Sequence, residues 1–250
     1  MYQKNKKNIL NDKDRNLLEY LFMNKVALPK QINRDVFGKL SMPNVYRRLY
    51  RLTNAQFILH HYFTWNGDPY RAFSLTPQGF KTCVKGDDVS HIRKQLRSEN
   101  VIHDIQLVDI QERFNRLTMV LEYHTENYLR SNCDHARIVL KEYLNNINSD
   151  ALLKIKFSQS EHYVPLEYER EQKVAKRYEN LFLDYYLNSK VPAVLYIAEN
   201  EKVLKKMVEV ATNVSSGFPP KIFFIPYDKL MANDQSVTFI NHLGHQMQLK

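Results

Sequence analysis

The sequence predicts an α+β protein of two domains, one mainly helical and one built around a mixed sheet. Three segments with helical periodicity precede a β-hairpin pattern within residues 12–75. A second series, within residues 150–230, alternates strands and helices. Charge divides in the same way: residues 1–97 hold 18 Lys and Arg against 7 Asp and Glu, and residues 98–250 hold 18 against 20. We therefore expect domains at 1–97 and 98–250, the first of which meets a polyanion.

Composition excludes several classes of protein. The chain is 44% hydrophobic and 25% charged, which is typical of a globular protein. No apolar stretch approaches the ~20 residues that span a bilayer, and the basic start lacks the apolar core of a signal peptide. We expect a cytoplasmic protein without a membrane partner. The glycines form neither a dinucleotide fingerprint nor a Walker loop, and Cys83 and Cys133 are too few for a zinc cluster or disulfide framework.

The first domain begins with three predicted helices, at residues 12–28, 30–40 and 41–58. Asp12 or Asp14 is the predicted N-cap of the first helix, and Gly38 stands near the end of the second, where helices favour glycine. The predicted inward-facing residues recur at helical spacing: Leu17, Leu18, Leu21, Phe22, Ile32, Val36, Phe37, Val45, Leu49 and Leu52.

A hairpin follows the third predicted helix. The β-rich runs "FILHHYFTW" and "PYRAFSLT" flank Asn66–Gly67, a strong signal for a two-residue turn. A further helix is expected to open at Pro77.

Three helices and a hairpin in this order resemble a winged helix-turn-helix over residues 12–85. The resemblance implies that the third helix lies in the major groove of double-stranded DNA. Arginine binds phosphate or guanine and asparagine pairs with adenine. Three arginines without an acid on this helix favour DNA contact over a merely solvated face. The candidate DNA-binding residues on this helix are Asn44, Arg47, Arg48 and Arg51. On the hairpin, Arg71 and the pair His60 and His61 are weaker candidates for contact with the DNA backbone or minor groove.

The second domain is predicted to form a mixed sheet flanked by helices. A helix over 100–117 comes first. Strands over 150–157 and 163–169 then form a hairpin, and a long helix over 171–187 follows the second strand. Strand, helix and strand over 192–198, 201–211 and 221–230 complete the series.

Acidic residues at the strand ends resemble the layout of restriction-endonuclease-like nucleases. Asp150 opens one strand, and Glu167 and Glu169 lie on one face of the next because they are two residues apart. Lys173 is expected on the following helix, and Glu126 is a possible additional acid. If the site is active, Asp150 and Glu167 would ligate Mg²⁺, which activates water, while the lysine stabilises charge on the phosphate. The alternative is a degenerate or purely structural version of the same fold.

Taken together, the motifs are similar to the replication-relaxation family of bacterial plasmid and mobile-element proteins. They are "HDIQLVDIQERF", "YHTENYLRS", "SDALLKI" and "PLEYEREQKVAKRYENLFLDYY", which follow the helices and hairpin over most of the chain. The resemblance implies a DNA-binding protein acting in replication, mobilisation or transcriptional regulation. One departure is "NSDAL", which stands where Pro-Asp is expected and puts Asp150 in question as a metal ligand.

Three functions follow from these features. The leading one is a DNA-binding protein acting through its winged helix. The second is a Mg²⁺-dependent deoxyribonuclease that the winged helix directs to DNA. The third is an adaptor that recruits a replication or mobilisation protein, and the helix around Tyr178–Tyr186 offers a face for a homodimer.

Overall fold

The computed structural model is an α+β protein whose chain divides into two compact units, residues 1–108 and 109–250. The division falls within helix α5 (Val101–Asn115). The polar stretch in which the sequence analysis set its boundary lies mostly outside the described residues. Those residues are 10–38, 40–83, 98–130, 139–140, 142–144, 147–157, 159–232 and 235–250.

The first unit opens with helix α1 (Asp12–Asn24), whose N-cap is Asn11. The prediction of Asp12 or Asp14 as the cap was wrong. Asp14 is instead the third helical residue, and its carboxylate accepts the backbone N–H of Asn11 at 3.2 Å while the Asn11 side chain accepts that of Asp14 at 2.9 Å. This reciprocal pair is a capping box. The helix ends before Lys25, which has a φ of 62°.

Short helices connect α1 to the exposed helix α3 (Met42–Asn54). Helix α2 (Pro29–Ile32) runs into a π-helical turn, η1 (Asn33–Phe37), which ends at Gly38 in the left-handed conformation. The predicted glycine cap is confirmed. Helix α4 (Pro77–Cys83) follows the hairpin, as predicted.

A three-stranded antiparallel sheet of order β1-β3-β2 completes the first unit. Strand β1 (Val26–Ala27) was not predicted, whereas β2 (Ile58–Trp65) and β3 (Asp68–Leu75) form the expected hairpin. Asn66 and Gly67 both have positive φ, 53° and 86°. A two-residue turn of this kind matches the right-handed twist of the flanking strands.

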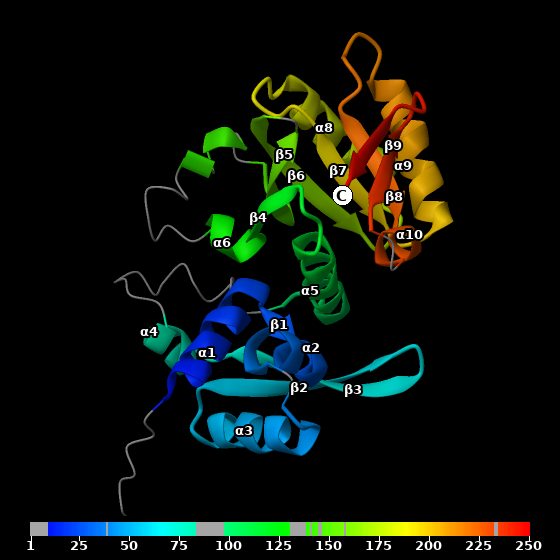
Figure 1. Ribbon diagram of the computed structural model, residues 1–250. Helices are drawn as coiled ribbons and strands as arrows, with labels where there is room; N and C mark the ends of the chain where they lie inside the picture. The colour runs from blue at the N-terminus through cyan, green and yellow to red at the C-terminus, as the bar shows by residue number, and fades with distance from the viewer. Residues whose placement is uncertain are drawn as a thin grey trace, which may run out of the picture. The chain divides into compact units, whose positions relative to one another are not determined.

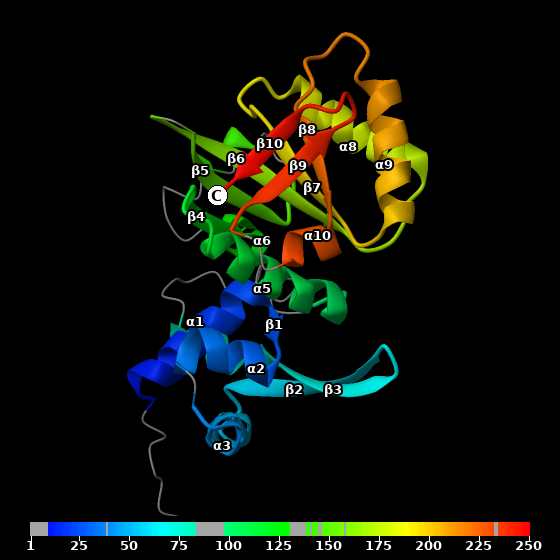
Figure 2. The ribbon, with the colours of Figure 1, turned by 45° about the vertical axis from the view of Figure 1, so that its right-hand side comes forward.

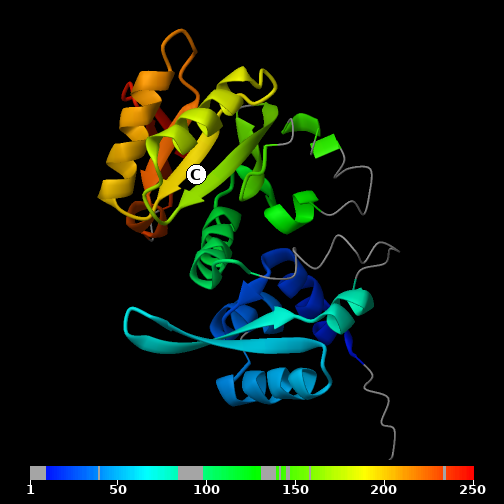
Figure 3. The ribbon, with the colours of Figure 1, turned by 180° about the vertical axis from the view of Figure 1, so that it is seen from behind.

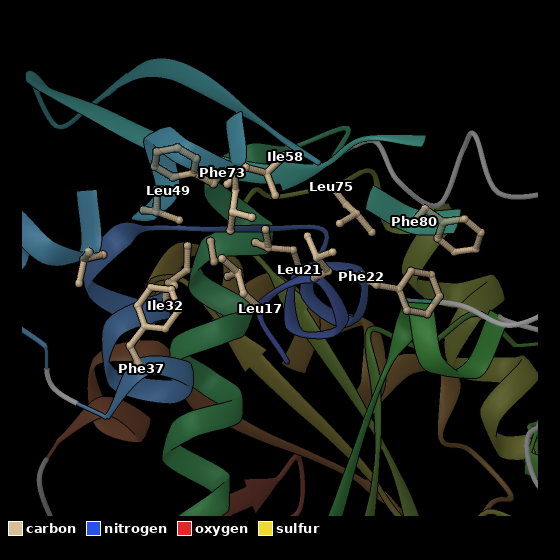
Figure 4. Packing of buried hydrophobic residues seen from close by; sticks show 14 residues of the cluster. Leu17, Leu21, Phe22, Ile32, Phe37, Leu49, Ile58, Phe73, Leu75 and Phe80 are labelled. Atoms are coloured by element: carbon tan, nitrogen blue, oxygen red, sulfur yellow. The ribbon is translucent and has the colours of Figure 1, made fainter. Parts of the chain in front are cut away.

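The core of the first unit lies between the helices and one face of the hairpin. Figure 4 shows side chains of α1, including Leu17 and Leu21, pointing toward Leu49 of α3 and toward Ile58 and Phe73 of the hairpin; all are buried. The opposite face of the hairpin packs against the beginning of α5, where Val26, Ala72 and Ile105 form a smaller apolar cluster. Helix α3 lies alongside β2, and the tip of the hairpin extends past the N-terminal end of α3 (Figure 1).

The second unit contains a seven-stranded mixed sheet of order β10-β9-β8-β7-β6-β5-β4. Strands β6, β7 and β8 are parallel neighbours, and the remaining pairs are antiparallel. The strands are β4 (Val120–Thr125), β5 (Ala151–Phe157), β6 (Ser160–Glu169), β7 (Val194–Ala198), β8 (Ile222–Pro226), β9 (Val237–Asn241) and β10 (Gln246–Leu249). The final pair, β9 and β10, was not predicted.

Helices cover both faces of this sheet. On one face lie α8 (Ala175–Leu187) and α9 (Glu201–Val214), which join the parallel strands (Figure 3). On the other face, Phe114 of α5 contacts the ring of Phe239 with centroids 6.3 Å apart, and α10 (Tyr227–Met231) follows β8. Helix α6 (Glu126–Arg130) follows β4 directly. The alternation of strands and helices predicted from the sequence is confirmed.

The sheet curls so that its first and last strands meet at one end (Figure 2). The backbone N–H of Met119, just before β4, donates to the carbonyl of Lys250, just after β10, at 2.8 Å. The N–H of Lys156 donates in turn to the carbonyl of Met119 at 2.8 Å, and β4 contains a register shift between Val120 and Glu122. Among the described residues, no helix has both the length and the apolar character needed to cross a membrane.

Candidate functional site

The outward side of α3 combines amide, guanidinium and aromatic groups. It borders an open hollow of about 800 Å³. We call the exposed residues of this lining the α3 face. They are Asn44, Arg47, Tyr50, Arg51 and Asn54. The hollow suits an extended polar ligand rather than an enclosed small molecule, because it lies on the surface and is lined by three arginines, Arg47, Arg48 and Arg51.

Two of the predicted DNA-binding arginines, Arg48 and Arg51, pair with a buried acid. The carboxylate of Asp14 is fully buried and contacts Nε of Arg48 at 2.8 Å and Nη2 of Arg51 at 2.5 Å. The Arg48 side chain is only 17% exposed, and its guanidinium lies 5.1 Å from the ring centroid of Phe37. Arg48 therefore acts mainly in packing, whereas Arg51 is 52% exposed and keeps a surface available to a ligand.

Arg47 and Asn44 form a separate pair on the exposed side of α3. The Nη2 atom of Arg47 donates to Oδ1 of Asn44 at 2.8 Å, across one helical turn. This side-chain hydrogen bond lies at the surface of α3, within the lining of the hollow. Of the predicted arginines on α3, Arg47 is the one best placed to meet a ligand.

Two tyrosines on α3 did not enter the sequence prediction. Tyr50 is 68% exposed and Tyr46 is 43% exposed. The spacing of four residues places both on the same side of the helix. The signal was present in the sequence, because neither residue belongs to the apolar stripe of Val45, Leu49 and Leu52.

The hairpin carries a second group of aromatic and basic side chains. The guanidinium of Arg71 lies 4.8 Å from the ring centroid of Tyr62, and the ring of His60 meets Tyr62 edge-on at 5.0 Å. His61 is on the other face, where its Nε2 contacts the hydroxyl of Ser74 at 2.7 Å and burial lowers its pKa. Arg71 and His60 thus both contact the ring of Tyr62, whereas His61 packs on the other face of the hairpin.

The predicted acidic residues of the second unit lie at one place in the sheet. Strands β5 and β6 pair Ala151 with Leu166; the same antiparallel register, one residue further, sets Asp150 opposite Glu167. Residues opposite each other in such a pair share a face. Asp150 is held there because its Oδ2 accepts the backbone N–H of Tyr168 at 2.8 Å. We call Asp150, Glu167, Glu169 and Lys173 the acidic cluster.

Glu126 reaches the same strand ends through its backbone. Its N–H donates to the carbonyl of Asp150 at 2.9 Å, whereas its carboxylate pairs with Arg130 at 2.5 Å. The backbone of Glu126 therefore lies beside Asp150, while its carboxylate forms an ion pair with Arg130 along α6.

Glu167 is the most deeply buried acid of the cluster. Its side chain accepts a hydrogen bond from the hydroxyl of Tyr185 on α8, and the residue is 6% exposed. Burial raises the pKa of the Glu167 carboxyl well above its ordinary value, and the nearby negative charge of Asp150 adds to this effect, while Tyr185 opposes it. The Glu167 carboxyl consequently keeps its proton to a higher pH than an exposed glutamate does.

Glu169 pairs with Lys173 while leaving one oxygen without a partner. The Nζ atom of Lys173 lies 2.5 Å from Oε1 of Glu169, and Oε2 is buried without a hydrogen bond. Burial raises the pKa of the Glu169 carboxyl, and Lys173 opposes that rise.

Lys173 lies in the loop before α8, so the prediction that it stands on the helix was wrong. Helix α8 begins at Ala175 rather than at Glu171. The loop is held by the hydroxyl of Tyr178, which accepts the backbone N–H of Lys173 at 3.1 Å and donates to the carbonyl of Glu171 at 3.5 Å. The loop thus folds Lys173 back over Glu169.

The cluster as built does not fit a Mg²⁺ ion. Carboxylate oxygens are suitable ligands, and the unpartnered Oε2 of Glu169 is the one feature that favours a cation. However, Tyr185 and Lys173 each hold one carboxylate oxygen, and Asp150 accepts a backbone N–H. Across the described ranges, no three His, Cys, Asp or Glu residues are arranged to hold a metal ion.

The pairing of Asp14 predicts a large effect on stability. Asp14→Ala should lower the free energy of unfolding by about 3 kcal/mol, because Arg48 would be left largely buried without its partner. Urea denaturation measures this. The control is Asp12→Ala on the exposed side of the same helix turn, for which a change below about 0.5 kcal/mol is expected. Equal stabilities of the two variants would contradict the structural role of Asp14.

Burial of Glu167 predicts a specific dependence of stability on pH. The pKa of the folded state lies above the ordinary 4.5, so the folded chain binds this proton more tightly than the unfolded chain. The resulting stability is complete below 4.5 and is lost as pH rises toward the folded pKa. Glu167→Gln, which keeps an acceptor for Tyr185, should therefore raise the melting temperature at about pH 8 and lose this advantage toward about pH 4.5.

The control for this measurement is Glu161→Gln on the same strand. Lys154 lowers the pKa of the exposed Glu161, so this variant should show no gain in melting temperature at high pH. Both variants are measured with EDTA present. If Glu161→Gln gained as much in melting temperature as Glu167→Gln, the effect would come from net charge rather than from burial.

Comparisons with known protein families, with curated proteins and with solved structures found no match.

Proposed function

We propose that the chain is a DNA-binding protein in which residues 12–83 form a winged helix and α3 is the recognition helix. The observation that carries the proposal is the α3 face, where Arg47 and Arg51 lie exposed around the open hollow. The excess of 18 basic over 7 acidic residues in 1–97 supports it, because a polyanion would be attracted to this part of the chain.

The arrangement of α3 and the hairpin agrees with this proposal. The hairpin continues past the N-terminal end of α3 (Figure 1), as the wing of such a domain does when it follows the duplex beside the recognition helix. On the α3 face, Asn44 offers an amide for adenine and Arg47 a guanidinium for guanine or phosphate. Arg71 on the hairpin would contact the phosphate backbone. Arg48 supports these residues from within.

For the second unit we propose a restriction-endonuclease-like fold that does not cut DNA. Three antiparallel strands, β4 to β6, lead through α8 to the parallel strand β7, with acids beside the ends of β5 and β6. This order supports the fold. The exposure of Glu167 and Glu169, 6% and 4%, argues against cleavage, since both carboxyls are shielded from a phosphate backbone. If the resemblance to replication-relaxation proteins reflects function, the protein acts in replication, mobilisation or transcriptional regulation of a plasmid or mobile element.

Substitution of Arg47 tests the recognition helix. Arg47→Ala should weaken binding of a mixed-sequence duplex about tenfold, and should reduce the slope of log affinity against log salt by about one if the lost contact is a phosphate. Fluorescence anisotropy at several salt concentrations measures both. Lys176→Ala, which removes an exposed positive charge from α8, is the control and should leave both values unchanged. Identical losses in the two variants would indicate nonspecific attraction.

Addition of Mg²⁺ tests whether the acidic cluster is a nuclease site. We expect no change in the melting temperature of the EDTA-treated protein and no nicking of supercoiled plasmid, because the carboxyls are buried and paired. A ligand that bound the folded state would raise the melting temperature by mass action. A Mg²⁺-dependent rise or plasmid cleavage that Glu169→Gln abolishes would replace our proposal with a nuclease.

A further inference from the structure

Tyr62 presents an aromatic ring to solvent on the hairpin. The residue is 66% exposed, although it stands on the same face of β2 as the buried Ile58. Single exposed apolar residues are ordinary on protein surfaces. Tyr62 differs because two neighbours hold it in place, the guanidinium of Arg71 at 4.8 Å and the ring of His60 at 5.0 Å.

The strands that carry Tyr62 form a regular hairpin. Eight residues of β2 pair with eight of β3 without a register shift. On the opposite face, the ring of Tyr70 stacks on Phe63 and is tilted against Trp65, with both centroid separations at 5.7 Å. Cross-strand aromatic pairs of this kind stabilise a hairpin. The hairpin therefore presents the Tyr62 ring from a regular, paired backbone.

An exposed aromatic ring fixed beside a cation matches an unpaired base better than an intact duplex. In a duplex the faces of the bases are covered by their neighbours, and only edges rich in donors and acceptors are accessible. Proteins that bind unpaired bases instead combine a basic surface with aromatic side chains on which the bases stack. Arg71 lies over one face of the Tyr62 ring, so a base would stack on the other face, and Arg71 would supply the charge for the adjoining phosphate.

The α3 face also combines an exposed aromatic ring with cationic side chains. Tyr50 is 68% exposed and lines the hollow together with Arg47 and Arg51. The hydroxyl of an exposed tyrosine can contact a phosphate of a duplex, whereas its ring offers a surface on which an unpaired base can stack. With Tyr46, which is 43% exposed, the described part of the basic unit carries three exposed tyrosines, and these favour a ligand that displays base faces.

We propose that the DNA bound by this protein is a duplex with unpaired bases, and that one unpaired base stacks on Tyr62. The inference rests on the proposed function and narrows it. Arg47 and Arg51 hold the double-stranded part, and the hairpin reaches the neighbouring unpaired base. Arg71 contacts the phosphate of that nucleotide.

Binding of three DNAs of equal length to the full chain tests the proposal. The DNAs are an intact duplex, the same duplex with a bulge, and one with a single-stranded tail. The wild type should bind the bulged or tailed DNA about tenfold more tightly, in line with the stacking of one base on an aromatic ring. Tyr62→Ala should lose this preference and keep its affinity for the intact duplex, while Tyr62→Phe should keep the preference.

Thr64→Ala is the matched control, since Thr64 is exposed on the same strand and the same face. A fluorescent base analogue in the bulge reports stacking directly: wild type and Tyr62→Phe should quench it, and Tyr62→Ala should not. Circular dichroism verifies that each variant is folded.

Two outcomes separate this inference from the proposed function. Equal affinity for intact and bulged DNA, or a preference that persists in Tyr62→Ala, overturns the inference and leaves duplex binding in place. Binding to none of the three DNAs overturns both.

Discussion

The buried carboxylate of Asp14 is the contact on which the geometry of the first unit depends. A charge without solvent needs full compensation, and here it comes from the cap of α1 and from two arginines of α3. Because α1 and α3 share this charge, it fixes the rotation of α3 about its axis together with the buried Val45, Leu49 and Leu52. That rotation turns Arg48 inward and leaves Arg47 on the surface. A buried residue thus helps to determine which positive charges α3 presents at its surface.

A similar rule explains why the second unit tolerates two glutamates inside its sheet. Glu167 has the hydroxyl of Tyr185, and Glu169 has the ammonium of Lys173. Each partner satisfies one oxygen, and burial favours the protonated form of both acids. The arrangement keeps the carboxyls beside the ends of β5 and β6, yet covers them with α8 and the loop before it. Glu167 and Glu169 therefore lie at the strand ends without being accessible to solvent.

Much of the fold could be predicted because its signals are local. Asn66–Gly67 specified the hairpin turn, and helical spacing identified Leu49 and the other core residues of the first unit. The pairing of Asp14 with Arg48 spans 34 residues, so no local pattern reveals it. The placement of Lys173 failed for a related reason: good helix formers precede Ala175, but Tyr178 holds their backbone as a loop. The burial of Glu167 likewise depends on Tyr185, which only packing brings near.

The meeting of Met119 with Lys250 has a consequence for behaviour in a crowded solution. An open sheet ends in strands whose unpaired N–H and C=O groups invite strand addition from other chains, which leads to aggregation. Here the two outermost strands satisfy each other at one end, and the register shift in β4 interrupts the remaining edge. The curl of the sheet therefore shortens the exposed edges that a seven-stranded sheet would otherwise present, and helps to keep neighbouring copies from joining sheet to sheet.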